Sequence, residues 1–232
     1  MLILAGLKAR AETFDVVSIK PNNSGSGRSS ESTNPGRVIA VNFTVSSLIQ
    51  QAFGVKAFQI SGGPGWLTTD NYDLNATTGT MKDLNDEELR PYFASLLADR
   101  FGFRFHRETR EMPIYSLLVA KTGSKMTAHE GGGDSTTHIS TGSGRSSITS
   151  VNLSMAHLAD LLGARLDRVV VDRTELPGGY EVTLQWAPNP AGDTTDPSIF
   201  TALQEQLGLR LESAKGPIEF IIVDNLERPS EN

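Results

Sequence analysis

The feature that most constrains this chain is an internal duplication. The segment VNLSMAHLADLLGARLDRVVVDRTELPGGYEVTLQW, from Val151 to Trp186, repeats the pattern of VNFTVSSLIQQAFGVKAFQISGGPGWLTTDNYDLNA, from Val41 to Ala76. Later matches keep the same order and pair Phe101–Phe105 with Leu207–Leu211 and Pro113–Val119 with Pro217–Val223. The offset falls from 110 residues (41 to 151) to 104 (113 to 217). Each change lies in a predicted turn, where length changes cost little. The sequence therefore predicts two copies of one fold.

Each copy contains two helix signals. Thr44 is a good N-cap for a helix over Val45–Phe53, and Ser154 takes the same place in copy two. The second helix begins near Asn85, where Asn85-x-x-Glu88 fits a capping box, and it ends at Arg100. In copy two we expect Asp196 to cap the matching helix, with Pro197 at its first position.

The strands are predicted from β-branched, alternating segments between turn residues. Around the two helices of copy one they are Phe14–Lys20, Arg37–Val41, Ala57–Ser61 and Tyr72–Ala76. Phe101–His106 and Ile114–Lys121 are expected to pair as a hairpin around 107–113. The Gly-, Ser- and Thr-rich segments 22–36 and 122–147 are expected to be polar loops.

These elements predict an α+β fold of two tandem pseudo-symmetric β-α-β-β-α-β-β units that form one compact body. The element order is similar to that of the short N-terminal modules of secretins and TonB-dependent receptors, and that likeness does not fix a function. The expected organisation is an N-terminal segment 1–13, a first repeat 14–121, a polar loop 122–147 and a second repeat 148–232.

Composition limits the function classes. The 232 residues carry a net charge of -6, so no electrostatic argument favours nucleic acid or an anionic membrane as a partner. The chain has no cysteine, which removes disulfides, thiolate metal sites and a cysteine nucleophile. No stretch has the length of apolar sequence that a transmembrane helix needs. Leu2–Leu7 and Ala9-Arg10-Ala11 fit either an incomplete signal peptide or an ordinary N-terminal helical turn.

Several motifs carry a family resemblance. They are FDVVSIKPN, ISGGPGWLTTDNYDLNA, LRPYFASLLADRFGFRFHRETREMPIYSLLVAK and VVVDRTELPGGYEVTLQW, between Phe14 and Trp186. This set resembles the soil-associated protein family of Acidobacteria, a group of uncharacterised secreted proteins, over essentially Phe14 to Pro229. The resemblance implies export to the periplasm or the exterior, and some members are fused to a BlaR-type sensor peptidase. It implies no catalytic residue.

The sequence contains no motif that assigns a catalytic, cofactor-binding or metal-binding residue. The four histidines lack H-x-H or H-x-x-x-H spacing, and no serine lies in a G-x-S-x-G or S-x-x-K motif. Gly62-Gly-Pro-Gly65 follows a predicted strand, but no helix with Lys-Ser/Thr follows it, so it is a turn and not a phosphate cradle. We therefore expect no cofactor.

Acidic and aromatic residues around the two matching turns are the remaining candidates for a groove or turn site. They are Trp66, Asp70, Tyr72, Asp73, Asp172, Arg173, Tyr180 and Glu181. Carboxylates that converge across a cleft would perform general acid–base chemistry or glycoside hydrolysis. Local ion pairs and exposed strand positions explain the same residues without chemistry.

Two functions stay open from the sequence. The first is a non-enzymatic binding or interaction module of the periplasm or cell surface, with a protein, peptide or glycan partner. The alternative is an extracellular hydrolase that uses the carboxylates of the turns, or a ligand-sensing domain for a membrane partner. The first interpretation is favoured because the two copies share no set of catalytic residue types.

Overall fold

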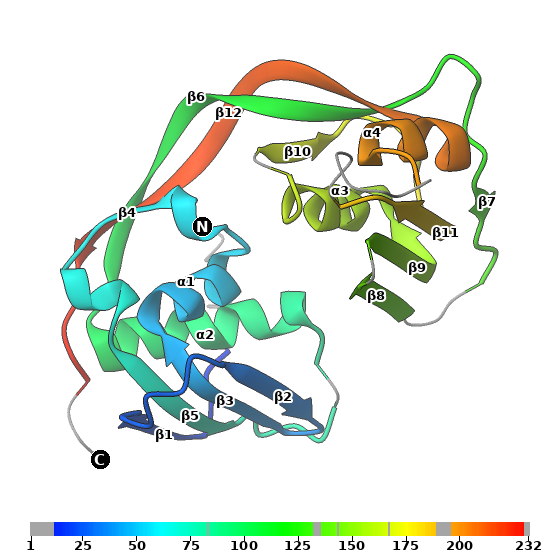
Figure 1. Cartoon of the computed structure of the whole chain (residues 1–232). Coiled ribbons are helices and arrows are strands. Elements are labelled where there is room, and N and C mark those ends of the chain that lie inside the picture. Colours follow the sequence, from blue (N-terminus) through cyan, green and yellow to red (C-terminus); the bar gives the residue numbers. More distant parts are fainter. Residues whose placement is uncertain are drawn as a thin grey trace, which may run out of the picture. The chain divides into compact units, whose positions relative to one another are not determined.

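The structure is a computed structural model that describes residues 12–82, 84–131, 136–142, 144–166, 168–188 and 196–229. Most of the predicted N-terminal segment 1–13 lies outside these residues. The predicted α+β class is confirmed, since helices and three four-stranded sheets make up the described chain (Figure 1). The chain divides into two compact units. Unit 1 comprises Met1–Arg110 and Ile218–Asn232, and unit 2 comprises Glu111–Pro217.

Unit 1 is built on an antiparallel sheet with two helices on one face (Figure 1). The strand order is β1 (Val16–Pro21), β5 (Asn71–Thr77), β3 (Arg37–Thr44) and β2 (Ser30–Asn34). The helices are α1 (Val45–Phe53) and α2 (Asp86–Phe101). Both predicted caps are confirmed, because Thr44 accepts a hydrogen bond from the Ser47 N–H and Asn85 forms the capping box with Glu88.

Unit 2 repeats this sheet strand for strand. The order is β7 (Thr127–Ala128), β11 (Gly179–Trp186), β9 (Arg145–Ser154) and β8 (Thr136–Gly142). The helices are α3 (Met155–Gly163), capped by Ser154 as predicted, and α4 (Ile199–Ala202), which continues as a π-helical turn over Leu203–Leu207. Tyr72 and Tyr180 hold equivalent places, opposite Pro21 of β1 and Ala128 of β7. The common strand order supports the predicted duplication.

A third sheet contains the two longest strands, in the order β10 (Val169–Asp172), β6 (Arg104–Val119), β12 (Leu209–Asn225) and β4 (Ile60–Gly62). The predicted hairpin around 107–113 is wrong, because this segment lies inside the single strand β6. It contains no Gly or Asn that would favour a tight hairpin turn. The neighbouring strand β12 supplies the hydrogen-bonding partner that a hairpin would have supplied.

The two copies exchange their closing strands, which are the matching segments Ile114–Val119 of β6 and Ile218–Val223 of β12. Copy one's segment lies in unit 2, where β10 pairs with it in parallel, and copy two's segment lies in unit 1, where β4 pairs with it. The chain therefore passes from one unit to the other within β6 and returns within β12. For this reason the limits of the units differ from the sequence repeats 14–121 and 148–232.

Each unit has its own hydrophobic core, and each closing strand contributes to the core of the unit that receives it. Ile221 and Val223 are buried with the helices of unit 1, and Leu117 is buried with those of unit 2. The residues that follow the closing strands show the same exchange. The Glu227 N–H donates to the Phe101 carbonyl in unit 1 (2.7 Å), and the Lys125 N–H donates to the matching Leu207 carbonyl in unit 2 (3.0 Å).

The two segments predicted as polar loops contain strands, so that prediction is wrong in part. Segment 22–36 includes β2, and segment 122–147 includes β7 and β8. These strands lie at the edges of their sheets, where little of the strand needs to be apolar. The predicted start of the last helix is also wrong. Ser198 caps α4, whereas Asp196 accepts hydrogen bonds from the Arg145 guanidinium.

Both copies carry the same β-bulge. Val41 and Asn42 together lie opposite Asp73, and Val151 and Asn152 lie opposite Glu181. Asn42 and Asn152 adopt left-handed φ values of 62° and 61°, which asparagine tolerates better than most residues. The Asn42 amide also donates to the carbonyls of Ser26 and Arg28 at 2.7 and 3.1 Å.

The bulge gives a matched test of the duplication. We expect Asn42→Val and Asn152→Val each to lower the free energy of unfolding by about 1–3 kcal/mol, because a β-branched residue is strained at positive φ. Asn42→Gly and Asn152→Gly should cost less, since glycine adopts this conformation freely. Urea denaturation measures all four variants. A valine variant as stable as its glycine counterpart would contradict the role assigned to the bulge.

Candidate functional site

Unit 1 contains a pocket of about 430 Å³ that brings three of the predicted site residues together. Asp70 and Tyr72 line it, and the ring of Trp66 lies against a third lining residue, Arg228. The described residues that line it are Pro21, Asn22, Asn23, Thr69, Asp70, Asn71, Tyr72, Arg228 and Pro229. The walls are polar, and three of their side chains are primary amides.

Three segments of unit 1 build this pocket. The end of β1 leads into Asn22, whose N–H donates to the Asn71 carbonyl at 2.8 Å. A short 3₁₀ helix, Gly65–Thr68, sets Asp70 at the start of β5, where the Asp70 N–H donates to the Trp66 carbonyl at 3.0 Å. The third segment is the C-terminal one that follows β12. It brings Arg228 to unit 1, so the pocket depends on the exchange of closing strands.

Arg228 is held from two sides. Its Nε and Nη2 atoms donate to Asp70 Oδ2 at 3.1 and 2.9 Å. Its guanidinium carbon lies 5.1 Å from the centroid of the Trp66 ring, within the range of a cation–π contact. The Asp70 carboxylate raises the pKa of Arg228, which stays charged. The positive and negative charges of the wall thus balance each other.

Tyr72 lines the pocket from the hydrophobic core of unit 1. It is 4% exposed, and its ring meets Phe101 edge-on with centroids 5.6 Å apart. Burial raises the pKa of the phenol, the negative charge of Asp70 adds to this rise, and Arg228 opposes it. The hydroxyl is therefore a neutral donor and acceptor at physiological pH.

The raised pKa of Tyr72 gives a prediction at alkaline pH. The phenol ionises near pH 10 in the unfolded chain but only at higher pH in the folded chain, so the folded state holds more protons in that window. Its contribution to stability is therefore lost as pH rises through the window. We expect Tyr72→Phe to lose less stability than the parent as the pH rises above about 10, as measured by urea denaturation. An unchanged pH slope would contradict the assignment.

Asp73, the fourth candidate in unit 1, has a structural role, because its carboxylate accepts hydrogen bonds from two residues of the same unit. Its Oδ1 atom accepts from Asn22 Nδ2 at 2.6 Å and from the Asn42 N–H at 3.0 Å. Asp73 thereby fixes the bulge and positions Asn22 at the pocket rim.

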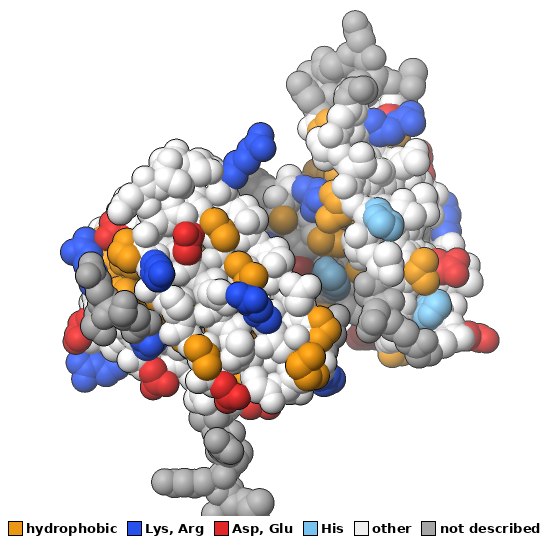
Figure 2. All heavy atoms as spheres, turned by 90° about the horizontal axis from the view of Figure 1, so that it is seen from below, with side chains coloured by type: hydrophobic (Ala, Val, Ile, Leu, Met, Phe, Trp, Pro, Cys, Tyr) orange, Lys and Arg blue, Asp and Glu red, His pale blue; other side chains and the backbone are white. Residues whose placement is uncertain are grey.

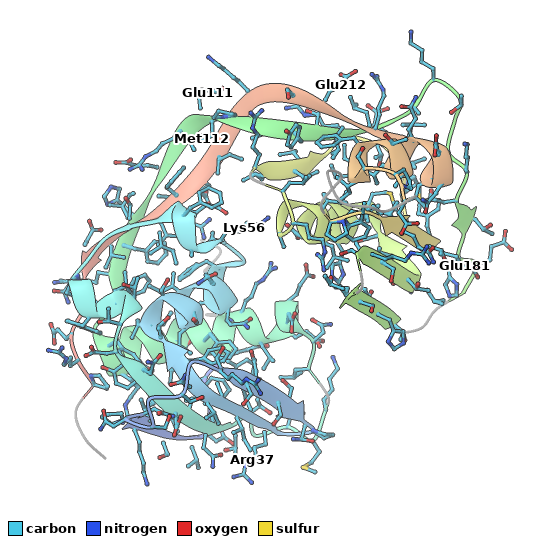
Figure 3. The ribbon with its side chains drawn as sticks, in the orientation of Figure 1. Arg37, Lys56, Glu111, Met112, Glu181 and Glu212 are labelled. Atoms are coloured by element: carbon cyan, nitrogen blue, oxygen red, sulfur yellow. The ribbon has the colours of Figure 1, made fainter. Side chains whose placement is uncertain are left out.

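The four candidates in unit 2 do not form a comparable site. Asp172 closes a turn by accepting from the N–H and hydroxyl of Thr174 at 2.9 and 2.8 Å. Next to it, the Arg173 N–H donates to the Leu117 carbonyl at 2.9 Å. Tyr180 is buried in the core of unit 2, and Glu181 is exposed on the outer face of β11 (Figure 3). In this unit the place of Asp70-Asn71 is taken by Gly178-Gly179, so the polar side chains of the pocket are not repeated.

Sequence reasoning missed Arg228, because its partner Asp70 is 158 residues away and only the exchanged strand connects them. Among the described residues, no group of three or more His, Asp or Glu side chains is arranged to hold a metal ion. None of the described helices has the length and apolar character needed to span a membrane. On the face shown in Figure 2, acidic and basic side chains of the described residues are interspersed.

Comparison with known proteins adds a family. The family model described as "Protein of unknown function (DUF3738)" matches residues 46–226, which is most of the chain. No curated protein and no solved structure gives a significant match.

Proposed function

The chain belongs to the DUF3738 family of proteins of unknown function, and from this premise we propose that it is a non-enzymatic binding module of the periplasm or cell surface. The pocket of unit 1 is its ligand site. The location is supported by the resemblance of its motifs to a family of secreted proteins. The observation that carries the binding function is the convergence of Trp66, Asp70, Tyr72 and Arg228 around one polar pocket.

The ligand that best fits this pocket is a neutral molecule rich in hydroxyl groups, such as one or two residues of a glycan. The primary amides of Asn22, Asn23 and Asn71 combine donors and acceptors, as hydroxyl groups require. The Asn22 amide already donates to Asp73 and accepts from Ser24, so the amides of Asn23 and Asn71 carry most of this role. Arg228, the one arginine among the described residues of the wall, is already paired with Asp70, so an anionic ligand would have to displace that carboxylate. A cationic ligand would in turn have to displace Arg228 from the Asp70 carboxylate.

The hydrolase alternative finds less support in the geometry. Asp70 is paired with Arg228, and Asp172 closes a turn. Asp73 accepts hydrogen bonds from two nitrogen atoms. A glycosidase needs two carboxyl groups on opposite sides of a cleft, with one of them free to exchange protons. In the sensing alternative the same pocket binds the ligand. It differs from the proposal only in that a membrane partner, such as a BlaR-type peptidase, responds to the bound state.

Titration calorimetry of the full chain with neutral oligosaccharides, short peptides, inorganic phosphate and Ca²⁺ tests the proposal. We expect heat from one or more saccharides. Arg228→Gln and Asp70→Asn should each weaken that binding at least about tenfold, the effect of losing a buried polar partner in the complex. The matched control is Arg145→Gln, which removes the similar Arg145–Asp196 pair of unit 2 and should leave saccharide binding unchanged.

The outcome with anions separates the alternatives. If phosphate or an acidic peptide binds, and Asp70→Asn strengthens this binding by releasing Arg228, the pocket is an anion site and the proposed ligand class is wrong. If no saccharide binds and every tested class gives no heat, the proposed ligand site is wrong.

A further inference from the structure

Among the residues that the structure describes, strand β8 is an unprotected edge of the unit 2 sheet. It is the outermost strand in the order β7-β11-β9-β8, and its side chains are largely exposed. Its sequence, TTHISTG, contains no Asp, Glu, Lys, Arg or Pro. An edge strand directs alternate main-chain N–H and C=O groups away from its neighbour, and such a row of groups is a template for another strand.

The other edge strands among the described residues are blocked. In unit 1, β1 ends in Lys20-Pro21, and β2 carries Glu31. Glu31 pairs with Ala40, whose side chain is buried under the helices, and its carboxylate accepts from Gln51 of α1 at 2.8 Å. An added strand would bury this charge. The remaining edges, β4, β7 and β10, are three, two and four residues long.

A row of apolar side chains that are cross-strand neighbours runs across the unit 2 sheet and ends at β8. Ile139 pairs with Ile148 of β9, and Ile148 pairs with Leu184 of β11. Ile148 and Leu184 are fully buried, whereas Ile139 is 45% exposed, and no strand of the described residues covers its far side. One more strand beside β8 would continue this row and bury Ile139.

The sequence of β8 is nearly symmetric about Ile139. Thr137 and Thr141 lie two residues on either side of it, and His138 and Ser140 lie one residue on either side. Antiparallel pairing of β8 with itself about Ile139 places Ile139 against Ile139, and Thr137 against Thr141. Apolar and Thr–Thr cross-strand pairs of this kind are favourable, and no like charges meet.

We propose that two copies of this chain associate through β8, which pairs antiparallel with β8 of the second copy about a two-fold axis at Ile139. The partner is a second copy because the strand matches its own sequence in reverse. The surface is then isologous and closed, so association stops at the dimer. This inference does not depend on the ligand pocket of unit 1.

Sedimentation velocity of the full chain over a range of concentrations tests the dimer. We expect a monomer–dimer equilibrium in the parent, and at least about a tenfold weaker dimer in Ile139→Lys, because two ammonium groups would meet at the axis. The position is partly exposed, and circular dichroism confirms that the variant is folded. The matched control is Ser32→Lys at the centre of β2, which should leave the dimer unchanged. A monomeric parent, or a dimer that Ile139→Lys does not weaken, overturns the proposal.

Because the chain has no cysteine, a crosslink tests the register separately. Residues opposite each other at such an axis have Cα atoms within disulfide range. In a glutathione redox buffer, Ile139→Cys should form a disulfide-linked dimer, and Ser32→Cys should remain monomeric. If both variants crosslink equally, the β8 pairing is wrong.

Discussion

Replacement of Phe101 by alanine is expected to lower the free energy of unfolding by about 3–5 kcal/mol, the usual cost of removing a fully buried aromatic ring. Phe101 is the last residue of α2 and is 0% exposed, and its ring packs edge-on against Tyr72 beneath the pocket. Its carbonyl also accepts from the Glu227 N–H, so it lies where the C-terminal segment docks on unit 1.

Urea denaturation followed by tryptophan fluorescence measures this loss, since Trp66 reports on unit 1 and Trp186 on unit 2. The matched control is Phe101→Leu, which introduces the residue that copy two has at position 207 and should cost less because the cavity is smaller. A loss below about 1 kcal/mol for Phe101→Ala would show that the site collapses around the missing ring, contrary to the packing described.

A second large effect is expected at Gly208, which ends the last helix of unit 2 in the left-handed conformation with φ +67°. A Cβ atom there would lie 2.1 Å from the carbonyl oxygen of Gly123. That carbonyl belongs to the segment in which the Lys125 N–H docks on the Leu207 carbonyl, so the backbone cannot move without breaking this contact. Gly208→Ala should therefore cost more than about 3 kcal/mol, the φ penalty of about 1–2 kcal/mol plus the clash.

The matching glycine of copy one separates these two causes. Gly102 also ends a helix in the left-handed conformation, but a Cβ atom there meets its nearest neighbour at 3.4 Å, an ordinary contact. Gly102→Ala should therefore cost only about 1–2 kcal/mol, the penalty of positive φ. Thermal or urea denaturation compares the variants, and equal losses would contradict the close packing of segment 120–125 against the end of the last helix of unit 2.

The local structure was largely predictable from the sequence because its signals are local. The caps at Thr44, Asn85 and Ser154 satisfy N–H groups a few residues away, so their spacing alone identifies the helix starts. The duplication was also detectable, because similar segments recur in the same order in the two halves of the sequence. The start of α4 was mispredicted because Asp196 has a competing partner, Arg145, that is 51 residues away.

The exchange of the closing strands could not be predicted from the sequence. A closing strand of copy one has nearly the same apolar pattern as that of copy two, and it therefore fits the sheet of either unit. Whether the chain turns back at segment 107–113 or continues as one strand depends on a partner that is distant in sequence, the neighbouring strand β12. The pocket was only half predicted for the same reason: Trp66, Asp70 and Tyr72 are close in sequence, whereas Arg228 reaches them through the exchange.

A difference between the two matching turns gives a physical reason why, among the described residues, this kind of pocket is found in unit 1 and not in unit 2. Both copies keep the tyrosine at the start of the central strand, but only copy one has Asp70 to hold an arginine. In unit 2 the corresponding glycines leave no carboxylate for such a contact. The architecture is thus shared by both copies, and the proposed binding chemistry is specific to unit 1.

The most direct test of the binding function uses the two tryptophans, because each unit contains one. A titration of the ¹⁵N-labelled full chain with a neutral oligosaccharide follows both indole N–H signals. The proposal predicts that the signal of Trp66, which lies against Arg228 at the pocket, shifts with saturation, while that of Trp186, buried in the core of unit 2, stays in place. If the Trp66 signal does not move for any saccharide, or if the Trp186 signal moves equally, the pocket of unit 1 is not the ligand site.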